Sequence, residues 1–165
     1  MSVIRELVAD PIADPKAVGS VLNPYVLSHG TLECRSLYLS RKFYEEFLGF
    51  ECAVHSPTSM AIRRGFKFHI VVVEIGDEIA PNRILNHWGI DMRTREEVDR
   101  AYEACFANRE KYGIREIKPL VDRHGVYGFY FEDLDYNWWE VEYYPDFLHD
   151  DIFDFGDRYE LKEPK

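Results

Sequence analysis

Three side chains of metal-binding type occupy related positions in the sequence. His29 lies in the segment SHGTLECRS, and His87 lies 58 residues later in the segment NHWGIDMRT. Glu140 lies in NWWEVEYY, a segment that otherwise has the composition of a buried strand. An ionised carboxylate in such surroundings needs a strong partner, and a metal ion is one. Two imidazoles and one carboxylate are the ligand set typical of non-haem iron(II) oxygenases, although zinc, nickel and manganese also bind such ligands.

The segments around the two histidines follow one pattern. Residues 28–36 align with residues 86–94, and the histidine, the arginine and an acidic position match. The same offset aligns Tyr44 with Tyr102. A repeat of this length indicates a duplicated supersecondary unit. A lone strand histidine usually belongs to a core, but equivalent histidines of a repeat are expected to face each other across a pseudo-twofold axis.

Each copy of the repeat carries the signals of a strand, a helix and three further strands. The first copy predicts a strand over 25–36, a helix over 37–48 that Gly49 ends, and strands over 50–55, 59–64 and 66–75. The second predicts a strand over 84–94, a helix from Thr94 to about Lys111 that Gly113 ends, and strands over 114–121, 125–133 and 137–144. Thr94 and Glu97 have the spacing of a capping box. His69 and Glu140 are expected at matching places in the two fourth strands.

The order of these elements predicts an α+β fold. We expect one domain, residues 25–144, of two paired βαβββ modules over 25–76 and 83–144. The modules would form an open, curved, eight-stranded mixed sheet around a metal cleft. Residues 1–24 would form an N-terminal arm, and residues 145–165 an acidic C-terminal tail.

Composition excludes several classes of partner. With 20 basic and 30 acidic residues, the net charge of −10 would repel nucleic acid and anionic membranes. The sequence has no apolar run that approaches a membrane span, and its three cysteines are far apart and suggest no disulfide framework. The first residues lack the apolar stretch of a signal peptide, so we expect a cytoplasmic protein.

A family resemblance joins these observations. The repeat, the segment SHGTLECRSLYLSRKFYEEFLGF and the segment FYFEDLDYNWWEVEYY resemble the vicinal oxygen chelate superfamily over about residues 25–144. That superfamily includes glyoxalase I, fosfomycin-resistance proteins, bleomycin-binding proteins, methylmalonyl-CoA epimerase and type I extradiol dioxygenases. The resemblance implies that His29, His87 and Glu140 are metal ligands. The superfamily's usual glycine in the final hairpin is Tyr136 here.

The segment FHIVVVE…PNRILNHWGIDM is similar to the extradiol dioxygenases. That similarity implies that His69 is an acid/base near the substrate, that Tyr130 hydrogen-bonds a substrate oxygen, and that His124 is a further histidine of the pocket. The implied function is ring cleavage of a small catechol-like aromatic, with iron(II) as the metal and O2 as the second substrate. Related proteins of two modules often pair, so we expect a homodimer.

Two alternatives remain open at this point, because one fold supports many chemistries. In a glyoxalase-, epimerase- or lyase-like enzyme, His69 would be a fourth ligand of zinc, manganese, nickel or cobalt, and the substrate would be a small oxygenated molecule. In a resistance-type binding protein, the cleft would hold a small molecule without a metal. The sequence does not distinguish the substrates.

Overall fold

The structure divides into two compact units, Met1–Ile79 and Ala80–Lys165. It is a computed structural model, and it describes residues 20–22, 24, 26–65, 68–123, 125–145, 157, 159–161 and 164. Most of the predicted N-terminal arm and most of the predicted acidic tail therefore lie outside the described residues. Among the described residues, no helix is both long enough and apolar enough to cross a membrane.

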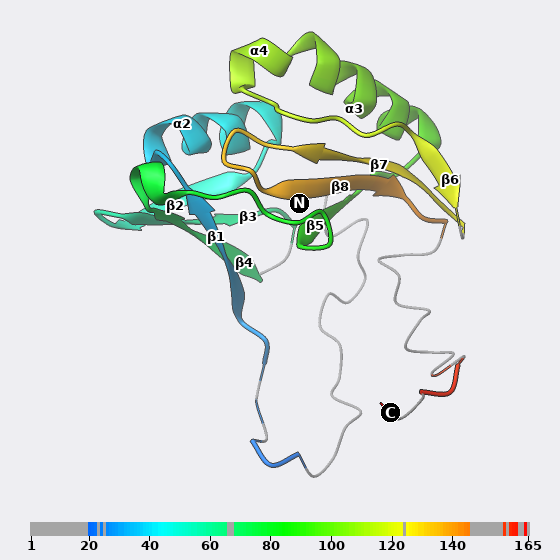
Figure 1. The fold of residues 1–165 in the computed structure, drawn as a ribbon, viewed down its shortest axis with the longest axis horizontal. Helices are drawn as coiled ribbons and strands as arrows, with labels where there is room; N and C mark the ends of the chain where they lie inside the picture. Colours follow the sequence, from blue (N-terminus) through cyan, green and yellow to red (C-terminus); the bar gives the residue numbers. More distant parts are fainter. Residues whose placement is uncertain are drawn as a thin grey trace, which may run out of the picture. The chain divides into compact units, whose positions relative to one another are not determined.

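The first unit contains one four-stranded sheet with a helical segment after its first strand (Figure 1). Its elements are β1 His29–Cys34, α2 Leu37–Lys42, the π-helix η1 Phe43–Phe47, β2 Glu51–Ser56, β3 Ser59–Arg63, β4 His69–Glu74 and the 3-10 helix η2 Gly76–Glu78. The strand order is β1-β4-β3-β2. β1 and β4 run parallel, whereas the other neighbours are antiparallel. Gly49 has φ 69°, which confirms the predicted glycine stop of the helix.

Alternation of side chains separates the two faces of this sheet. One face is buried and carries apolar residues, among them Leu32, Met60 and Val72. Phe43 and Tyr44 of the helical segment are buried as well. Successive strand residues point to opposite faces. The intervening positions therefore lie on the other, open face of the sheet.

The second unit repeats this topology. Its elements are β5 His87–Asp91, α3 Arg95–Ala107, α4 Arg109–Tyr112, β6 Val121–Arg123, β7 Val126–Glu132 and β8 Trp138–Tyr143. The strand order is β5-β8-β7-β6, and β5 and β8 are parallel (Figure 1). The prediction of an α+β fold with two βαβββ modules is thus confirmed. The eight strands of the described residues form two four-stranded mixed sheets, where one eight-stranded sheet was predicted.

The helical part of the second unit begins as predicted but is interrupted. The hydroxyl of Thr94 accepts a hydrogen bond from the Glu97 amide at 3.2 Å. The Glu97 carboxylate accepts from the amide of Arg93 at 2.8 Å, one residue before the N-cap. Asn108, at φ −113° and ψ 9°, separates α3 from α4, and Gly113 ends α4 with φ 69°. The single helix predicted to reach about residue 111 is therefore two helices.

The strand predicted over 114–121 is not continuous in the structure. Regular pairing is found in β6, Val121–Arg123, whereas residues 115–118 are joined to β7 by an isolated bridge between Ile117 and Phe131 and by three backbone hydrogen bonds. Proline has no amide hydrogen to donate to a neighbouring strand. Pro119 accordingly interrupts the apolar run, and this part of the prediction was wrong.

Candidate functional site

β5 and β8 bring His87 and Glu140 together within the second unit. The parallel register pairs His87 with Trp138 and Gly89 with Glu140, so the carboxylate lies two residues along β8 on the same face. His87 Nε2 is 3.0 Å from Glu140 Oε2, and the two side chains are only 27% and 18% exposed. The pair is therefore partly shielded from water.

The other ring nitrogen of His87 determines what this pair can bind. Nδ1 lies 2.8 Å from the carbonyl oxygen of Ile84. A carbonyl oxygen only accepts, so Nδ1 carries the hydrogen, and Nε2 of the neutral ring is an acceptor like the carboxylate. Two acceptors at this separation need a cation between them, either a proton or a metal ion.

Tyr130 contacts both members of this pair. It is the register partner of Glu140 on β7. Its ring packs edge-to-face on His87, with 5.0 Å between the centroids. Burial, and after it a hydrogen bond to Glu140, raise the pKa of the Tyr130 phenol well above its usual range. The phenol therefore stays protonated and donates its hydrogen toward the carboxylate.

His29 and His69 are neighbours within the first unit. They are register partners on β1 and β4. Their rings lie 5.7 Å apart between centroids and only 16° from parallel. His29 Nδ1 is 2.8 Å from the hydroxyl of Ser28. Two imidazoles thus stand side by side on the open face of this sheet.

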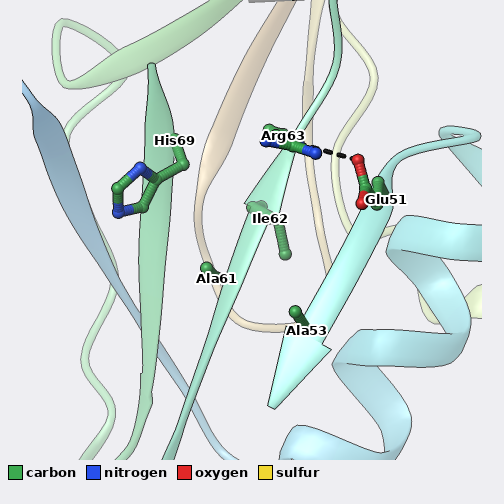
Figure 2. A pocket seen from close by; sticks show the side chains of 6 residues that line it. All are labelled: Glu51, Ala53, Ala61, Ile62, Arg63 and His69. Carbon is green, nitrogen blue, oxygen red and sulfur yellow. Dashed lines mark hydrogen bonds and ion pairs between the residues drawn. The ribbon is translucent and has the colours of Figure 1, made fainter. Parts of the chain in front are cut away.

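A hollow lies next to His69 on the same sheet (Figure 2). It is lined by Glu51, Ala53, Ala61, Ile62, Arg63 and His69. Ala53 and Ala61 are register partners on β2 and β3. Because their side chains end at Cβ, they leave room beside the imidazole. Arg63 Nε donates to Glu51 Oε2 at 2.7 Å, which places an ion pair at the margin of the hollow.

The predicted site residues thus lie in two groups, one in each unit. His87, Glu140 and Tyr130 form the group in the second unit, and His29 and His69 form the group in the first. His124 lies outside the described residues. Among the residues that are described, no three His, Cys, Asp or Glu side chains gather tightly enough to hold an ion. That His29 binds the same metal ion as His87 and Glu140 therefore stays a prediction.

One positional expectation is corrected by the strand register. His69 is paired with His29, and the matching position in the second unit is Trp138. Glu140 lies two residues beyond Trp138, so its counterpart in β4 is Val71. A valine cannot bind a metal ion. The first unit therefore has no carboxylate where the second has Glu140, and His69 and Glu140 do not match.

Sequence reasoning missed two parts of the site. The carbonyl of Ile84 fixes the His87 ring, and no side-chain type could have indicated a backbone group. The small residues of the hollow and its ion pair were also missed. Their only signal was one alanine in each of two neighbouring predicted strands, Ala53 and Ala61.

Comparison with known proteins identifies solved structures of the same fold. No protein-family model and no curated protein sequence matches the chain. The fosfomycin resistance protein FosX from Listeria monocytogenes is 26% identical, with a TM-score of 0.59, over 76% of this chain and 97% of that one.

Two further structures resemble the chain at lower identity. A glyoxalase/bleomycin resistance protein/dioxygenase from Alicyclobacillus acidocaldarius is 24% identical, with a TM-score of 0.54, over 75% of this chain and 95% of that one. Lactoylglutathione lyase from Agrobacterium tumefaciens is 16% identical, with a TM-score of 0.53, over 73% and 95% of the two chains. At these identities the likeness shows the fold alone.

Proposed function

We propose that this chain, which has the fold of the vicinal oxygen chelate superfamily, is an enzyme that depends on a divalent metal held by His29, His87 and Glu140. The resemblance to that superfamily is confirmed by the structural neighbours. One observation carries the proposal. In the neutral form of His87, Nε2 and Glu140 Oε2 are both acceptors, and they stand 3.0 Å apart while Nδ1 is bonded to the carbonyl of Ile84. A carbonyl contact of this kind is the usual support of a metal-binding histidine.

The metal would supply a Lewis acid to which two neighbouring substrate oxygens bind. We propose iron(II), with manganese, zinc, nickel and cobalt as the other candidates for this donor set. A FosX structure contains manganese(II), which supports a divalent ion on this fold.

For the reaction we propose extradiol-type ring cleavage of a small catechol-like aromatic. Both atoms of O2 enter the ring-opened product, so no further oxidant or reductant is needed. The hollow suits a flat ring, because Ala53 and Ala61 leave space beside His69. His69 would take the proton that a substrate hydroxyl loses and return it later.

Two other residues complete this proposal. Tyr130 would turn its single hydroxyl hydrogen from Glu140 to a substrate oxygen when the substrate binds. His124 would be a further histidine of the pocket. The register supports an acid/base role for His69, because the position equivalent to Glu140 in β4 is Val71 and not His69. We also propose that the protein is a homodimer and acts in the cytoplasm.

A second candidate is a hydrolase, lyase or epimerase that uses the same metal on a small oxygenated substrate. The 26% identity to FosX and the fold shared with lactoylglutathione lyase favour it. In that case His69 would be a fourth ligand. A metal-free binding protein is less well supported, because such a protein has no need of the His87–Glu140 pair.

Anaerobic purification with metal analysis, followed by oxygen uptake against a panel of catechols, tests the proposal. We expect one divalent ion per chain and consumption of O2 with a yellow ring-opened product. A bound metal without oxygen uptake would favour the second candidate. If the protein binds none of the five candidate metal ions, both proposed enzymatic functions are wrong.

The variant His69→Ala separates the two metal-dependent functions. We expect it to retain its metal and to lose most turnover, because an acid/base group is removed and no ligand is. His55→Ala is the matched control, since His55 is an exposed histidine bonded to Ser59 at 3.1 Å. Loss of metal from His69→Ala, with metal kept in the control, would identify His69 as a ligand and contradict ring cleavage.

A further inference from the structure

Four polar side chains cross the open face of the first sheet in a single row. His29 on β1 is paired with His69 on β4, and Glu51 on β2 is paired with Arg63 on β3. Ile62 on β3 is paired with Ile70 on β4 in antiparallel register, so the residues beside them, Arg63 and His69, are also neighbours. A guanidinium therefore stands next to the imidazole that we assign to proton transfer.

Arg63 has hydrogen-bond donors that no side chain or carbonyl of the described residues uses, so they can serve a ligand. Its bond to Glu51 uses Nε, at 2.7 Å. A guanidinium carries further N–H groups on its two terminal nitrogens. The Arg63 side chain is 48% exposed, and it borders the hollow beside His69 (Figure 2). Its terminal nitrogens can therefore reach a molecule in that hollow.

We propose that Arg63 binds an anionic group of the substrate, such as a carboxylate, and that Glu51 holds the guanidinium in orientation. The proposal rests on the proposed function and narrows its substrate class to small oxygenated aromatics that carry an acidic substituent. A guanidinium presents its N–H groups as a planar fork that matches the two oxygens of a carboxylate. The ring would lie over Ala53 and Ala61, next to both this fork and His69.

The negative net charge of the chain does not oppose this assignment. At physiological ionic strength, charges separated by more than about 8 Å of solvent are largely screened. The attraction between the guanidinium and an anion in contact with it is therefore stronger than the repulsion of that anion by distant acidic residues. Glu51 already neutralises part of the charge of Arg63. We therefore expect anionic ligands to bind about tenfold more tightly than neutral ones, which is the lower end of the range for hydrogen bonds to charged groups.

The test compares two ring compounds that differ mainly in one acidic group, 3,4-dihydroxybenzoate and 4-methylcatechol. Each is titrated without O2 into the full-length protein, and binding is followed by NMR. We expect the wild type to bind the benzoate about tenfold more tightly, and Arg63→Met to bind both with equal affinity. Arg64→Met is the matched control, because the neighbouring Arg64 donates instead to the carbonyl of Gly49 at 3.0 Å. The control should keep the preference.

The outcomes also separate this proposal from the proposed function. A wild type without the preference, or Arg63→Met with the preference intact, would show that the Glu51–Arg63 pair only joins two strands, and would overturn the assignment. Oxygen uptake with each compound is measured in parallel. If no catechol is cleaved while Arg63→Met alone loses the preference, ring cleavage fails and the anion site stands.

Discussion

At the scale of single residues, Tyr130 links the two predicted ligands of the second unit. Its phenol is bonded to Glu140, and its ring packs on His87. Removal of a group that orients a metal ligand commonly lowers metal affinity by about 10- to 100-fold. Tyr130 therefore has a positioning role in addition to any contact with substrate.

We predict that Tyr130→Phe lowers metal affinity by about tenfold, because the ring is kept and only the bond to Glu140 is lost. Competition of the full chain against a metal-chelating dye measures this. Tyr127→Phe is the control on the same strand, since the Tyr127 hydroxyl donates to Asp99 at 2.5 Å and not to a ligand. Equal affinities for both variants and the wild type would refute a positioning role for Tyr130.

At the scale of elements, the close approach of β7 and β8 sets the position of Glu140. Gly128 on β7 is paired with Glu142. A Cβ on Gly128 would lie 2.5 Å from the carbonyl oxygen of Val141 and 2.9 Å from Glu142 Cβ. Both distances are too short for real contacts, so only glycine allows this approach. The same strands carry the pair of Tyr130 and Glu140.

Gly128→Ala should destabilise the protein by about 2–3 kcal/mol, because the strands must separate to admit the methyl group. Equilibrium unfolding in urea measures this change. Gly89→Ala provides the control, since its Cβ would meet only Glu142 Oε1 at 3.6 Å, an ordinary contact. We expect Gly89→Ala to lower the free energy of unfolding by less than about 0.5 kcal/mol. A Gly128→Ala protein as stable as that control would contradict the register argument.

The final hairpin carries Tyr136 at the position where the resemblance to the superfamily implies a glycine. Tyr136 adopts φ 64°, a conformation that costs a non-glycine residue roughly 1–2 kcal/mol. The guanidinium of Arg115 lies 3.9 Å from the centre of the Tyr136 ring, and such contacts contribute about 0.5–1 kcal/mol. The buried Asp133 carboxylate also accepts hydrogen bonds from the amides of Asp135 and Asn137. These contacts offset the cost of the tyrosine.

At the scale of the whole molecule, the proposed ligand set takes His29 from one unit and His87 and Glu140 from the other. These residues are far apart in an unfolded chain. An ion that needs all three therefore binds the folded protein and stabilises it by mass action. With this proposed ligand set, metal binding is coupled to the stability of both units.

We predict that excess manganese(II) raises the melting temperature of the wild type by about 5–10 °C, which corresponds to about 2.7 kcal/mol at 100 times the dissociation constant. Differential scanning calorimetry measures the shift. His29→Ala and His87→Ala should each lose most of it, whereas His55→Ala should keep it. A full shift in His29→Ala would remove that residue from the ligand set.

The sequence by itself determined the elements of this protein and their order. Helical periodicity and strand alternation are local patterns, so the signals around Thr94, Gly49 and Gly113 were sufficient for the helix ends. The repeat, with its equivalent histidines, was sufficient for two βαβββ modules. The failure over 114–121 was also local, because the apolar pattern was given more weight than Pro119.

Only the tertiary structure decided which side chains meet. Alternation assigns a residue to a face of a sheet, but a shift of two residues between paired strands leaves every face unchanged. The sequence therefore could not distinguish His69 from Val71 as the counterpart of Glu140. Hydrogen bonds between strands far apart in the chain fix that register. They place Glu140 beside His87, and the pairing of the consecutive strands β3 and β4 places Arg63 beside His69.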